Sequence, residues 1–508
     1  MKKDFFKVLL KSSKSKARLG EIKTSHGVIK TPTFVAVGTK ATVKSLLPEL
    51  LKQIGVQSAF VNTYHLVCSP GVETIEKTGG VHKYANLNLP LMSDSGGFQV
   101  FSLAREEKNQ QRVFESTLTP IKVEGSSKSL IEKQLLKINY KKIKEQSFSS
   151  KSKTADIRGE EKPMLVKITD EEVKFRSIFD GRLIEFTPEK SIEYQMKIGA
   201  DIMMAFDECI YYGASYKYTK KATERTHQWL KRCVDFFKTR QRNFLSQWGP
   251  LHPKSEKNLL PLFFKKKFQH HDFLLTSPPT KVGGSPKSLT KNQVFPFPNL
   301  NQFLYGVIQG GIFKDLRTKS AEFVCSQNVD GIAIGGVSVG ETKKEMRDQV
   351  KWVADYLPED RPVHLLGVGQ VDDILDLVKY GIDSFDCVEP TRLARMGVIY
   401  QIFQVRHQVF ESTSPSTKVG GFPKSLTQKL ISSFFQKLDI NKSSYKNNLE
   451  PVDLNCCCYV CQNFTKSYLH HLFKQRELLG YTLATYHNLY VMEGFFEIIR
   501  KMIGEGRM

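Results

Sequence analysis

Three aspartates stand where apolar runs of the sequence end, and carboxylates in such places can do chemistry. Asp94 lies in SDSGGFQ, Asp207 in FDEC and Asp386 in FDCVEPTR. Glycosyl transfer with retention needs one carboxylate as the nucleophile and a second group that handles protons. An exchange of one base for another needs a further acid that binds the purine edge. The three acids match this count, although three aspartates in any large enzyme would match it as well.

A cysteine cluster late in the chain has the types and spacing of metal ligands. Cys456, Cys458 and Cys461 form a C-x-C-x2-C motif, and His487 follows in TYHNL. Three thiolates and one imidazole make a closed tetrahedral zinc site that leaves no position for water. We therefore predict one structural Zn2+ per chain at these four residues, with Cys457 directed away from the ion.

Two alternatives to this ligand set remain. His470 and His471 lie closer to the cysteines in the sequence, but they fall in a stretch where Tyr468, Leu469 and Leu472 predict a helix. The other alternative is a buried cysteine cluster that holds no metal. Nine cysteines in a chain of this length, four of them together, are not typical of a secreted disulfide framework.

The elements that must position the acids follow from an alternation of apolar runs with helical patterns, which is typical of β/α units. The runs end in polar residues or glycines, at the place where a (β/α)8 barrel keeps its active site. They cover residues 58–66, 91–100, 201–209, 305–311, 331–341, 363–369 and 381–397. We predict an α/β fold, an irregular (β/α)8 TIM barrel with an inserted or C-terminal zinc-binding subdomain.

Glycines and turn residues refine this pattern. The glycine pairs at 96–97 and 335–336 would let backbone N–H groups approach a flat ligand closely, or they form tight turns without one. The stretch 187–199 predicts a helix with Thr as its N-cap, Pro in its first turn and Gly at its end. The stretch 176–187 predicts a hairpin with an Asp-Gly turn.

The chain has 508 residues and a net charge of +23, which invites a nucleic-acid interpretation. Three windows, residues 107–163, 241–302 and 402–450, supply 16 of these 23 charges and show weak periodicity, so most of the charge need not serve function. The N-terminus has no signal-peptide pattern, and no apolar run approaches the roughly 18 residues of a membrane span. We predict a cytoplasmic protein without membrane contact.

The same windows share one segment, F-x-x-T-x4-K-V-x-G-x-x-K-S-L, at residues 114–130, 273–289 and 410–426. The copies lie too far apart to stack as a solenoid. We interpret them as copies of one in-frame element inserted into surface loops, where long insertions cost little closure entropy. The alternative is a basic ligand-binding motif that occurs three times. Without the windows about 340 residues remain, which suits one large domain with an appendage.

The prediction divides the chain into three parts. Residues 1–400 form the catalytic barrel domain, with insertions at about 107–163 and 241–302. Residues 401–450 are a third insertion, and residues 451–508 form the zinc-binding subdomain with the C-terminal helices.

Several long motifs occur together and in order: SDSGGFQVFSL, MAFDEC, GVIQGG, AIGGVSVGE, LLGVG, DSFDCVEPTRLAR and the cysteine motif with its histidine. They resemble the bacterial queuine tRNA-ribosyltransferases, also called tRNA-guanine transglycosylases, over nearly the whole chain outside the three windows. The resemblance implies an irregular TIM barrel with a zinc subdomain, usually as a homodimer. It also implies a pentosyl transfer of queuosine biosynthesis. That reaction replaces guanine at the wobble position of tRNAs with GUN anticodons (Asp, Asn, His, Tyr) by a 7-deazaguanine.

The resemblance also assigns roles to residues. Asp386 would be the nucleophile that attacks C1′ of the ribose, and Asp94 would take the proton from the incoming base. The base pocket would consist of Asp94, Ser95, Gly96, Gly97, Phe98, Asp207, Cys209, Gln309, Gly336 and Val337. The tRNA would contact Gly367, Val368, Gly369, Gln370, Val371, Asp372, Asp373, Thr391, Arg392, Leu393, Ala394 and Arg395.

Within the implied pocket, Asp207 and Gln309 would hydrogen-bond the polar edge of the purine. Gly336 would offer its backbone N–H, and Phe98 would stack on the ring. The target base must leave its stack to reach the acids, and a single-stranded loop permits that at low cost.

Four positions bear on which base is taken. Val337 and Leu366 stand where the bacterial family often has Leu and Met. Cys209 and Val339 keep bulk that the eukaryotic enzymes, which take queuine itself, tend to lack. We therefore predict the smaller base preQ1, with queuine salvage as the alternative.

A catalytically silent RNA-binding partner subunit is the rival from another class. Such a subunit has no reason to keep Asp94 and Asp386 in intact motifs, and this chain keeps both. A third interpretation is a decaying gene product whose insertions prevent folding, but no insertion interrupts a motif.

Overall fold

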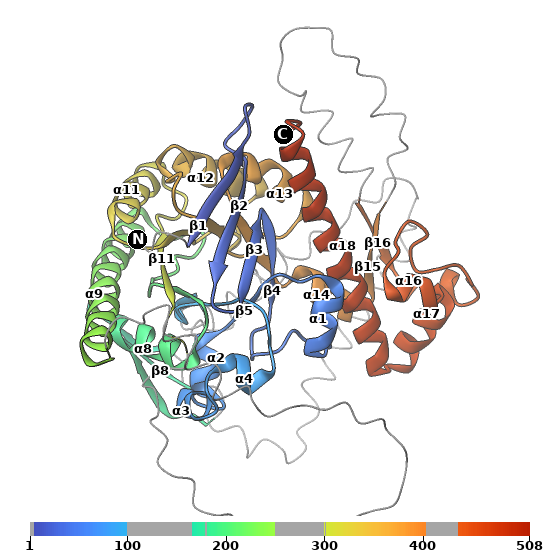
Figure 1. Ribbon diagram of the computed structural model, residues 1–508, viewed down its shortest axis with the longest axis horizontal. Helices are drawn as coiled ribbons and strands as arrows, with labels where there is room; N and C mark the ends of the chain where they lie inside the picture. The colour runs from blue at the N-terminus through green and yellow to red at the C-terminus, as the bar shows by residue number, and fades with distance from the viewer. Residues whose placement is uncertain (1–4, 99–164, 178–179, 249–298, 300, 403–434) are drawn as a thin grey trace, which may run out of the picture.

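The computed structural model describes residues 5–98, 165–177, 180–248, 299, 301–402 and 435–508 (Figure 1). Eight parallel strands close into a barrel in the order β4, β5, β6, β10, β11, β12, β13, β14. Their bounds are β4 Thr33–Val37, β5 Ala59–Val61, β6 Leu91–Ser93, β10 Ile202–Met204, β11 Phe303–Ile308, β12 Gly331–Ile334, β13 Val363–Leu365 and β14 Ser384–Cys387. Most of their residues are buried, because helices cover the outer face and side chains fill the interior. The predicted TIM barrel is confirmed, and β4 is the barrel strand that the sequence pattern did not point out.

A small antiparallel sheet covers the amino-terminal end of the barrel. It consists of β1 Phe6–Lys11, β2 Arg18–Thr24 and β3 Gly27–Thr31. Ile22 and Ile29 of this sheet belong to the same buried cluster as Ile202 and Phe303, the first residues of β10 and β11. Because apolar side chains close that end, the carboxyl-terminal end of the strands is left for polar residues.

Helices and a second small sheet surround the barrel (Figure 1). The helices are α1 Pro48–Ile54, α2 Thr63–Cys68, α3 Val72–Lys77, α4 Val81–Ala85, α8 Pro188–Ile198, α9 Tyr216–Trp248, α11 Lys314–Ser326, α12 Lys343–Val353, α13 Val371–Leu377 and α14 Glu389–Arg395, and the sheet is β7 Leu165–Ile168, β8 Val173–Arg176 and β9 Leu183–Phe186. The Thr187 hydroxyl accepts the Lys190 N–H at 3.1 Å, and Gly199 ends α8 with a φ of 79°. The predicted helix is confirmed, and β8 and β9 pair antiparallel as the predicted hairpin requires.

The carboxyl-terminal part lies against one side of the barrel. It contains β15 Val398–Ile402, β16 Phe435–Asp439, α16 Tyr459–Asn463, α17 Lys466–Gln475 and α18 Leu478–Gly504. The long helix α18 runs along the barrel in Figure 1, and its Phe496 ring lies 6.3 Å from Phe34 of β4 and 5.8 Å from Phe385 of β14. These contacts fix α18 to the strand that carries Asp386. No helix in the described ranges has both the length and the apolar character that crossing a membrane requires.

The insertion windows are only partly described. The three copies of the repeated segment and residues 107–163 lie outside the described residues. Residues 435–450 were predicted to belong to the third insertion, but β16 pairs with β15 and Leu438 and Ile440 are buried. Likewise α9 reaches Trp248, beyond the predicted start of the second window. A five-residue strand offers too few periods to stand out from polar neighbours, which explains why the sequence did not reveal β16.

Candidate active site and metal centre

Asp94 stands directly after β6, at the carboxyl-terminal end of the barrel. Its Oδ1 accepts the Thr63 backbone N–H at 2.7 Å, and its Oδ2 accepts the Asn62 side-chain amide. Burial raises the pKa of the Asp94 carboxyl to about 7, against the hydrogen bond from Thr63. The nearby charges of Asp207 and Asp386 add to the rise in pKa. Asp94 can therefore hold or release a proton near neutral pH.

Asp207 follows β10 and is buried beside two other predicted pocket residues. Ser95 Oγ donates to its Oδ1 at 2.9 Å, and Gln309 Nε2 donates to its Oδ2 at 2.8 Å. Burial raises the pKa of Asp207, although these two hydrogen bonds oppose the rise. The Oε1 atom of Gln309 is buried and has no hydrogen-bond partner among the described residues. An orphaned acceptor beside a buried carboxyl suits a ligand that donates hydrogen bonds.

Two glycines leave room for this arrangement. A Cβ at Gly97 would clash with the Asp207 carbonyl oxygen, and a Cβ at Gly336, whose φ is +61°, would clash with Gln309 Oε1. The Gly336 loop is held by Arg317 of α11, which donates to the Gly336 carbonyl oxygen at 2.7 Å. Arg317 is fully buried, and nothing in the local sequence marks it as part of the site.

Asp386 is the third residue of β14 and is 15% exposed through its side chain. Its Oδ1 accepts the Gly367 backbone N–H at 3.0 Å and lies 3.1 Å from Nε2 of His364 in β13. The charge of Asp386 contributes to the raised pKa of Asp94, so the two acids lie near each other. The three predicted acids therefore share the carboxyl-terminal end of the barrel.

The other residues predicted for the base pocket differ in exposure. Phe98 is 50% exposed, which suits a ring that stacks on a ligand, whereas Val337 is buried. Burial raises the pKa of the Cys209 thiol and so keeps it neutral. The loop after β12 is tied by Glu341, whose Oε2 accepts the Val339 N–H at 2.9 Å. Glu341 was not singled out from the sequence.

The predicted RNA-contacting stretches, residues 367–373 and 391–395, hold both buried and exposed side chains. The buried ones face the protein rather than a ligand, and they are Val368, Val371, Asp373, Thr391 and Ala394. Arg347 of α12 pairs with Asp372 at 2.8 Å and with Asp373 at 2.6 Å. If these stretches contact RNA as predicted, the side-chain contacts must come from the exposed positions.

Four cations gather beside these stretches. Burial lowers the pKa of Lys44, and the charges of Arg395, Lys40 and Arg392 lower it further. Burial and the Arg392 charge likewise lower the pKa of Arg395. Cations that depress one another's pKa lie close together, and such a cluster favours a polyanion. The motifs in the sequence pointed to the two arginines but not to Lys40 or Lys44.

The four predicted metal ligands lie together. The donor atoms of Cys456, Cys458, Cys461 and His487 are all within 4.8 Å of one another. His487 Nδ1 lies 3.4 Å from Cys458 Sγ and 3.2 Å from Cys461 Sγ, and its Nε2 lies 2.6 Å from the Tyr400 carbonyl oxygen. A carbonyl that fixes the outer ring nitrogen is usual for metal-binding histidines. The cluster could hold a metal ion.

The alternative ligand His470 and the neighbouring Cys457 both lie outside this cluster. His470 is in α17, as predicted, and its Nδ1 lies 2.7 Å from the Ile440 carbonyl oxygen. Cys457 is exposed, with its Sγ 3.1 Å from the Tyr490 hydroxyl. Neither residue belongs to the four-residue cluster.

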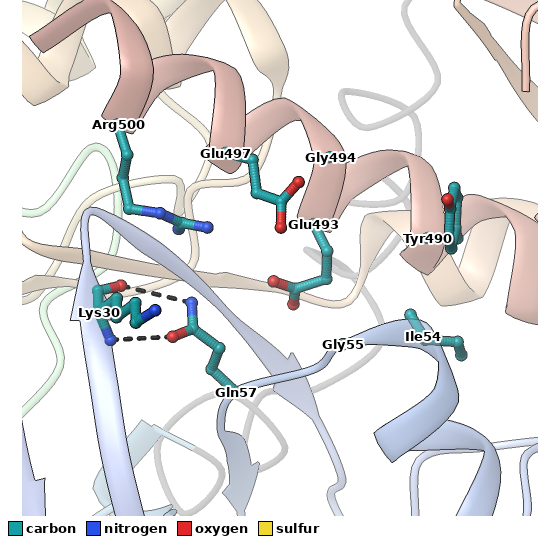
Figure 2. A pocket seen from close by; sticks show the side chains of 9 residues that line it. All are labelled: Lys30, Ile54, Gly55, Gln57, Tyr490, Glu493, Gly494, Glu497 and Arg500. Carbon is teal, nitrogen blue, oxygen red and sulfur yellow. Dashed lines mark hydrogen bonds between the residues drawn. The ribbon is translucent and has the colours of Figure 1, made fainter. Parts of the chain in front are cut away.

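A separate cavity of about 500 Å3 lies between β3, the segment after α1, and α18 (Figure 2). Its lining contains none of the predicted site residues. The Glu493 carboxyl is buried there, and its Oε1 has no hydrogen-bond partner among the described residues. Burial raises the pKa of Glu493 to about 8, and the Arg500 charge opposes this rise.

Comparisons with known proteins agree on one family. A family model described as queuine tRNA-ribosyltransferase matches residues 12–139, 149–270 and 287–508. A queuine tRNA-ribosyltransferase of Roseiflexus sp. (strain RS-1) is 34% identical over 502 residues, which cover 99% of this chain and 96% of that protein. One from Caldanaerobacter subterraneus subsp. tengcongensis is 34% identical over 503 residues, 99% of this chain and 94% of that protein. A putative queuine tRNA-ribosyltransferase of Archaeoglobus fulgidus is 32% identical over 500 residues, 98% of this chain and 96% of that protein.

Proposed function

Since the chain belongs to the queuine tRNA-ribosyltransferase family, we propose that it exchanges guanine 34 of GUN-anticodon tRNAs for the queuosine precursor preQ1. Membership makes the chain a tRNA-guanine transglycosylase, an enzyme that acts on tRNA and a free base. The observation that carries the finer proposal is the convergence of Asp94, Asp207 and Asp386 at one end of the barrel. One of these carboxyls has a pKa of about 7, and another adjoins an orphaned amide oxygen.

In the first half of the reaction Asp386 attacks C1′ of ribose 34 and forms a glycosyl ester with the tRNA. The C1′–N9 bond breaks and its electron pair leaves with guanine, which takes up a proton. Asp94 can supply this proton, because its pKa of about 7 leaves much of it protonated near neutral pH. Asp94 is then ionised for the next step.

In the second half the incoming base loses a proton to Asp94 as its ring nitrogen attacks C1′. The ester bond breaks, and its electron pair returns to the Asp386 carboxylate. Asp94 thus gives a proton to the departing guanine and takes one back from the incoming base. The enzyme is therefore regenerated without any other reactant.

Base recognition falls to Asp207 and Gln309. Both Asp207 oxygens accept hydrogen bonds within the protein, and the buried Gln309 Oε1 has no partner among the described residues. The N–H groups on the edge of a guanine-like base would donate a hydrogen bond to Gln309 Oε1. They would also favour the ionised form of the Asp207 carboxyl. Cys209 and Val339 would keep bulk in this pocket, which favours preQ1 over the larger queuine.

The tRNA backbone would lie over the cluster of Lys40, Lys44, Arg392 and Arg395. A cation cluster attracts phosphates without reading sequence, so recognition of the anticodon must come from bases that leave the loop. A silent RNA-binding subunit would need these four cations, but it would not need a carboxyl with a pKa near 7. The carboxyl of Asp94 therefore favours an active enzyme over a silent subunit.

The cysteine cluster would hold zinc as a structural ion. Its three thiols and one imidazole match the ligands that tetrahedral Zn2+ prefers. We take residues 1–400 as the catalytic domain and residues 451–508 as the zinc-binding subdomain, with β16 joined to it. Exposed apolar side chains on this subdomain, including Leu454 (68%) and Leu478 (77%), favour a homodimer.

Labelled preQ1 offered to the purified protein with an unmodified GUN-anticodon tRNA tests this function. We expect one labelled base per tRNA and release of one guanine. A matched transcript with adenine at position 34 should take up no label. Labelling of both transcripts, or of neither, would contradict the proposal, and a queuine competition would rank the two bases.

A further inference from the structure

A buried histidine lies against the proposed nucleophile. His364 of β13 is fully buried, and its Nε2 is 3.1 Å from Asp386 Oδ1. Its Nδ1 is 2.8 Å from the hydroxyl of Ser384, its partner across the β13–β14 pair. The Phe60 ring stacks on the imidazole with centroids 5.7 Å apart. The plane of the ring is therefore held from two edges and one face.

We propose that His364 is a positioning residue that holds the Asp386 carboxylate so that only Oδ2 attacks the ribose. This inference rests on the proposed function, in which Asp386 is the nucleophile. The Gly367 N–H also donates to Oδ1, at 3.0 Å, so two donors converge on one oxygen. No hydrogen bond from the described part of the chain reaches Oδ2. The two oxygens of the Asp386 carboxylate therefore differ, because Oδ1 accepts both hydrogen bonds and Oδ2 accepts neither.

The hydrogen bonds also determine which ring nitrogen carries the proton. A carboxylate only accepts hydrogen bonds, so Nε2 of His364 must be the donor to Asp386. In the neutral ring Nδ1 is then the acceptor, and the Ser384 hydroxyl donates to it. Ser384 and Asp386 are two residues apart on β14, so their side chains point to the same side of the strand. Asp386 thus selects the tautomer, and the Ser384 hydroxyl is compatible with it because a hydroxyl can donate to Nδ1.

This arrangement serves both halves of the exchange. When Oδ2 bonds to C1′ and the C1′–N9 bond breaks, Oδ1 becomes the carbonyl oxygen of the ester and keeps both donors. When the incoming base displaces the ester, negative charge returns to the carboxylate, and His364 and Gly367 stabilise the share on Oδ1. No proton needs to pass through the imidazole. His364 acts by holding the orientation of the Asp386 carboxylate and by stabilising its negative charge.

Two substitutions separate this role from packing. His364→Phe keeps a flat ring beside Phe60 but removes the donor, whereas His364→Gln keeps an N–H near the position of Nε2. The readout is the rate of covalent tRNA complex formation at saturating tRNA, measured together with tRNA affinity and the melting temperature. We expect His364→Phe to slow complex formation about 10- to 100-fold with unchanged tRNA affinity, because a misplaced nucleophile reacts slowly. His364→Gln should restore most of the rate.

Equal impairment by Phe and Gln would make the histidine a packing residue and overturn the proposal, as would a normal rate for the Phe variant. If the Phe variant fails to fold, the donor-free His364→Met takes its place in the comparison with Gln. Asp386→Asn is measured alongside. A covalent complex that persists in that variant would refute the nucleophile assignment itself, whereas its loss together with a normal rate for His364→Phe would refute only the role of His364.

Discussion

The proton-transfer role of Asp94 predicts that the two half-reactions depend on pH in opposite directions. With a pKa of about 7, roughly 10% of Asp94 is ionised at pH 6 and roughly 90% at pH 8. Attack by the incoming base needs the ionised form, so release of tRNA from the covalent complex should accelerate about tenfold from pH 6 to pH 8. Departure of guanine needs the protonated form, so formation of the covalent complex should slow by a similar factor.

Rapid-quench measurements can follow each half-reaction alone. Complex formation is measured with tRNA and no added base, and release is measured by adding preQ1 to isolated complex. Asp94→Asn should lower both rates by roughly 10²–10⁴ and abolish both inflections. Asp207→Asn is the matched control, because it removes a neighbouring buried carboxyl and should weaken base binding yet keep the inflections. Rates that stay flat between pH 6 and 8, or an inflection near 7 that survives Asp94→Asn, would rule out Asp94 as the group that transfers the proton.

Three further outcomes are expected. Cys458→Ser should lose zinc in elemental analysis and aggregate, and full zinc occupancy in that variant would contradict the ligand assignment. Because the pKa of Glu493, about 8 when folded, exceeds its ordinary 4.5, stability should fall as pH rises through this window. In urea unfolding, the Glu493→Gln variant should be more stable than the parent by up to about 5 kcal/mol at pH 8.5, and by much less at pH 5. A gain in stability that does not depend on pH would contradict a raised pKa for the Glu493 carboxyl shown in Figure 2. Short linkers in place of residues 249–298 and 403–434 should leave base exchange within about tenfold, and a thousandfold loss without unfolding would make the repeated element functional.

Local chemistry made much of the fold predictable. The buried strands of a parallel barrel are apolar on both faces, so they appear as runs that end in polar residues, as at Asp94 and Asp207. The helix α8 was delimited by the cap residues Thr187 and Gly199. The strand β4, Thr33–Val37, was missed because its apolar run is only five residues long and no acid or amide follows it directly.

The supporting side chains of the site could not be read from the sequence. Asn62 reaches Asp94 across 32 positions, and His364 reaches Asp386 across 22. Arg317 meets the Gly336 carbonyl oxygen from a different β/α unit. Such residues sit inside ordinary apolar or helical patterns, and only the closure of the barrel brings them to the acids. Spacing does reveal side chains that are close in sequence, which is why Cys456, Cys458 and Cys461 were predicted to lie together, as they do.

If Asp386 is the nucleophile, a covalent bond between this residue and the tRNA can be trapped. Protein and GUN-anticodon tRNA are mixed without added base and run on a denaturing gel, for the parent, Asp386→Asn and Asp94→Asn. We expect a tRNA-linked protein band for the parent, none for Asp386→Asn although that variant still binds tRNA, and a weaker band for Asp94→Asn. A band of normal yield with Asp386→Asn, or one that disappears only with Asp94→Asn, would rule out Asp386 as the nucleophile.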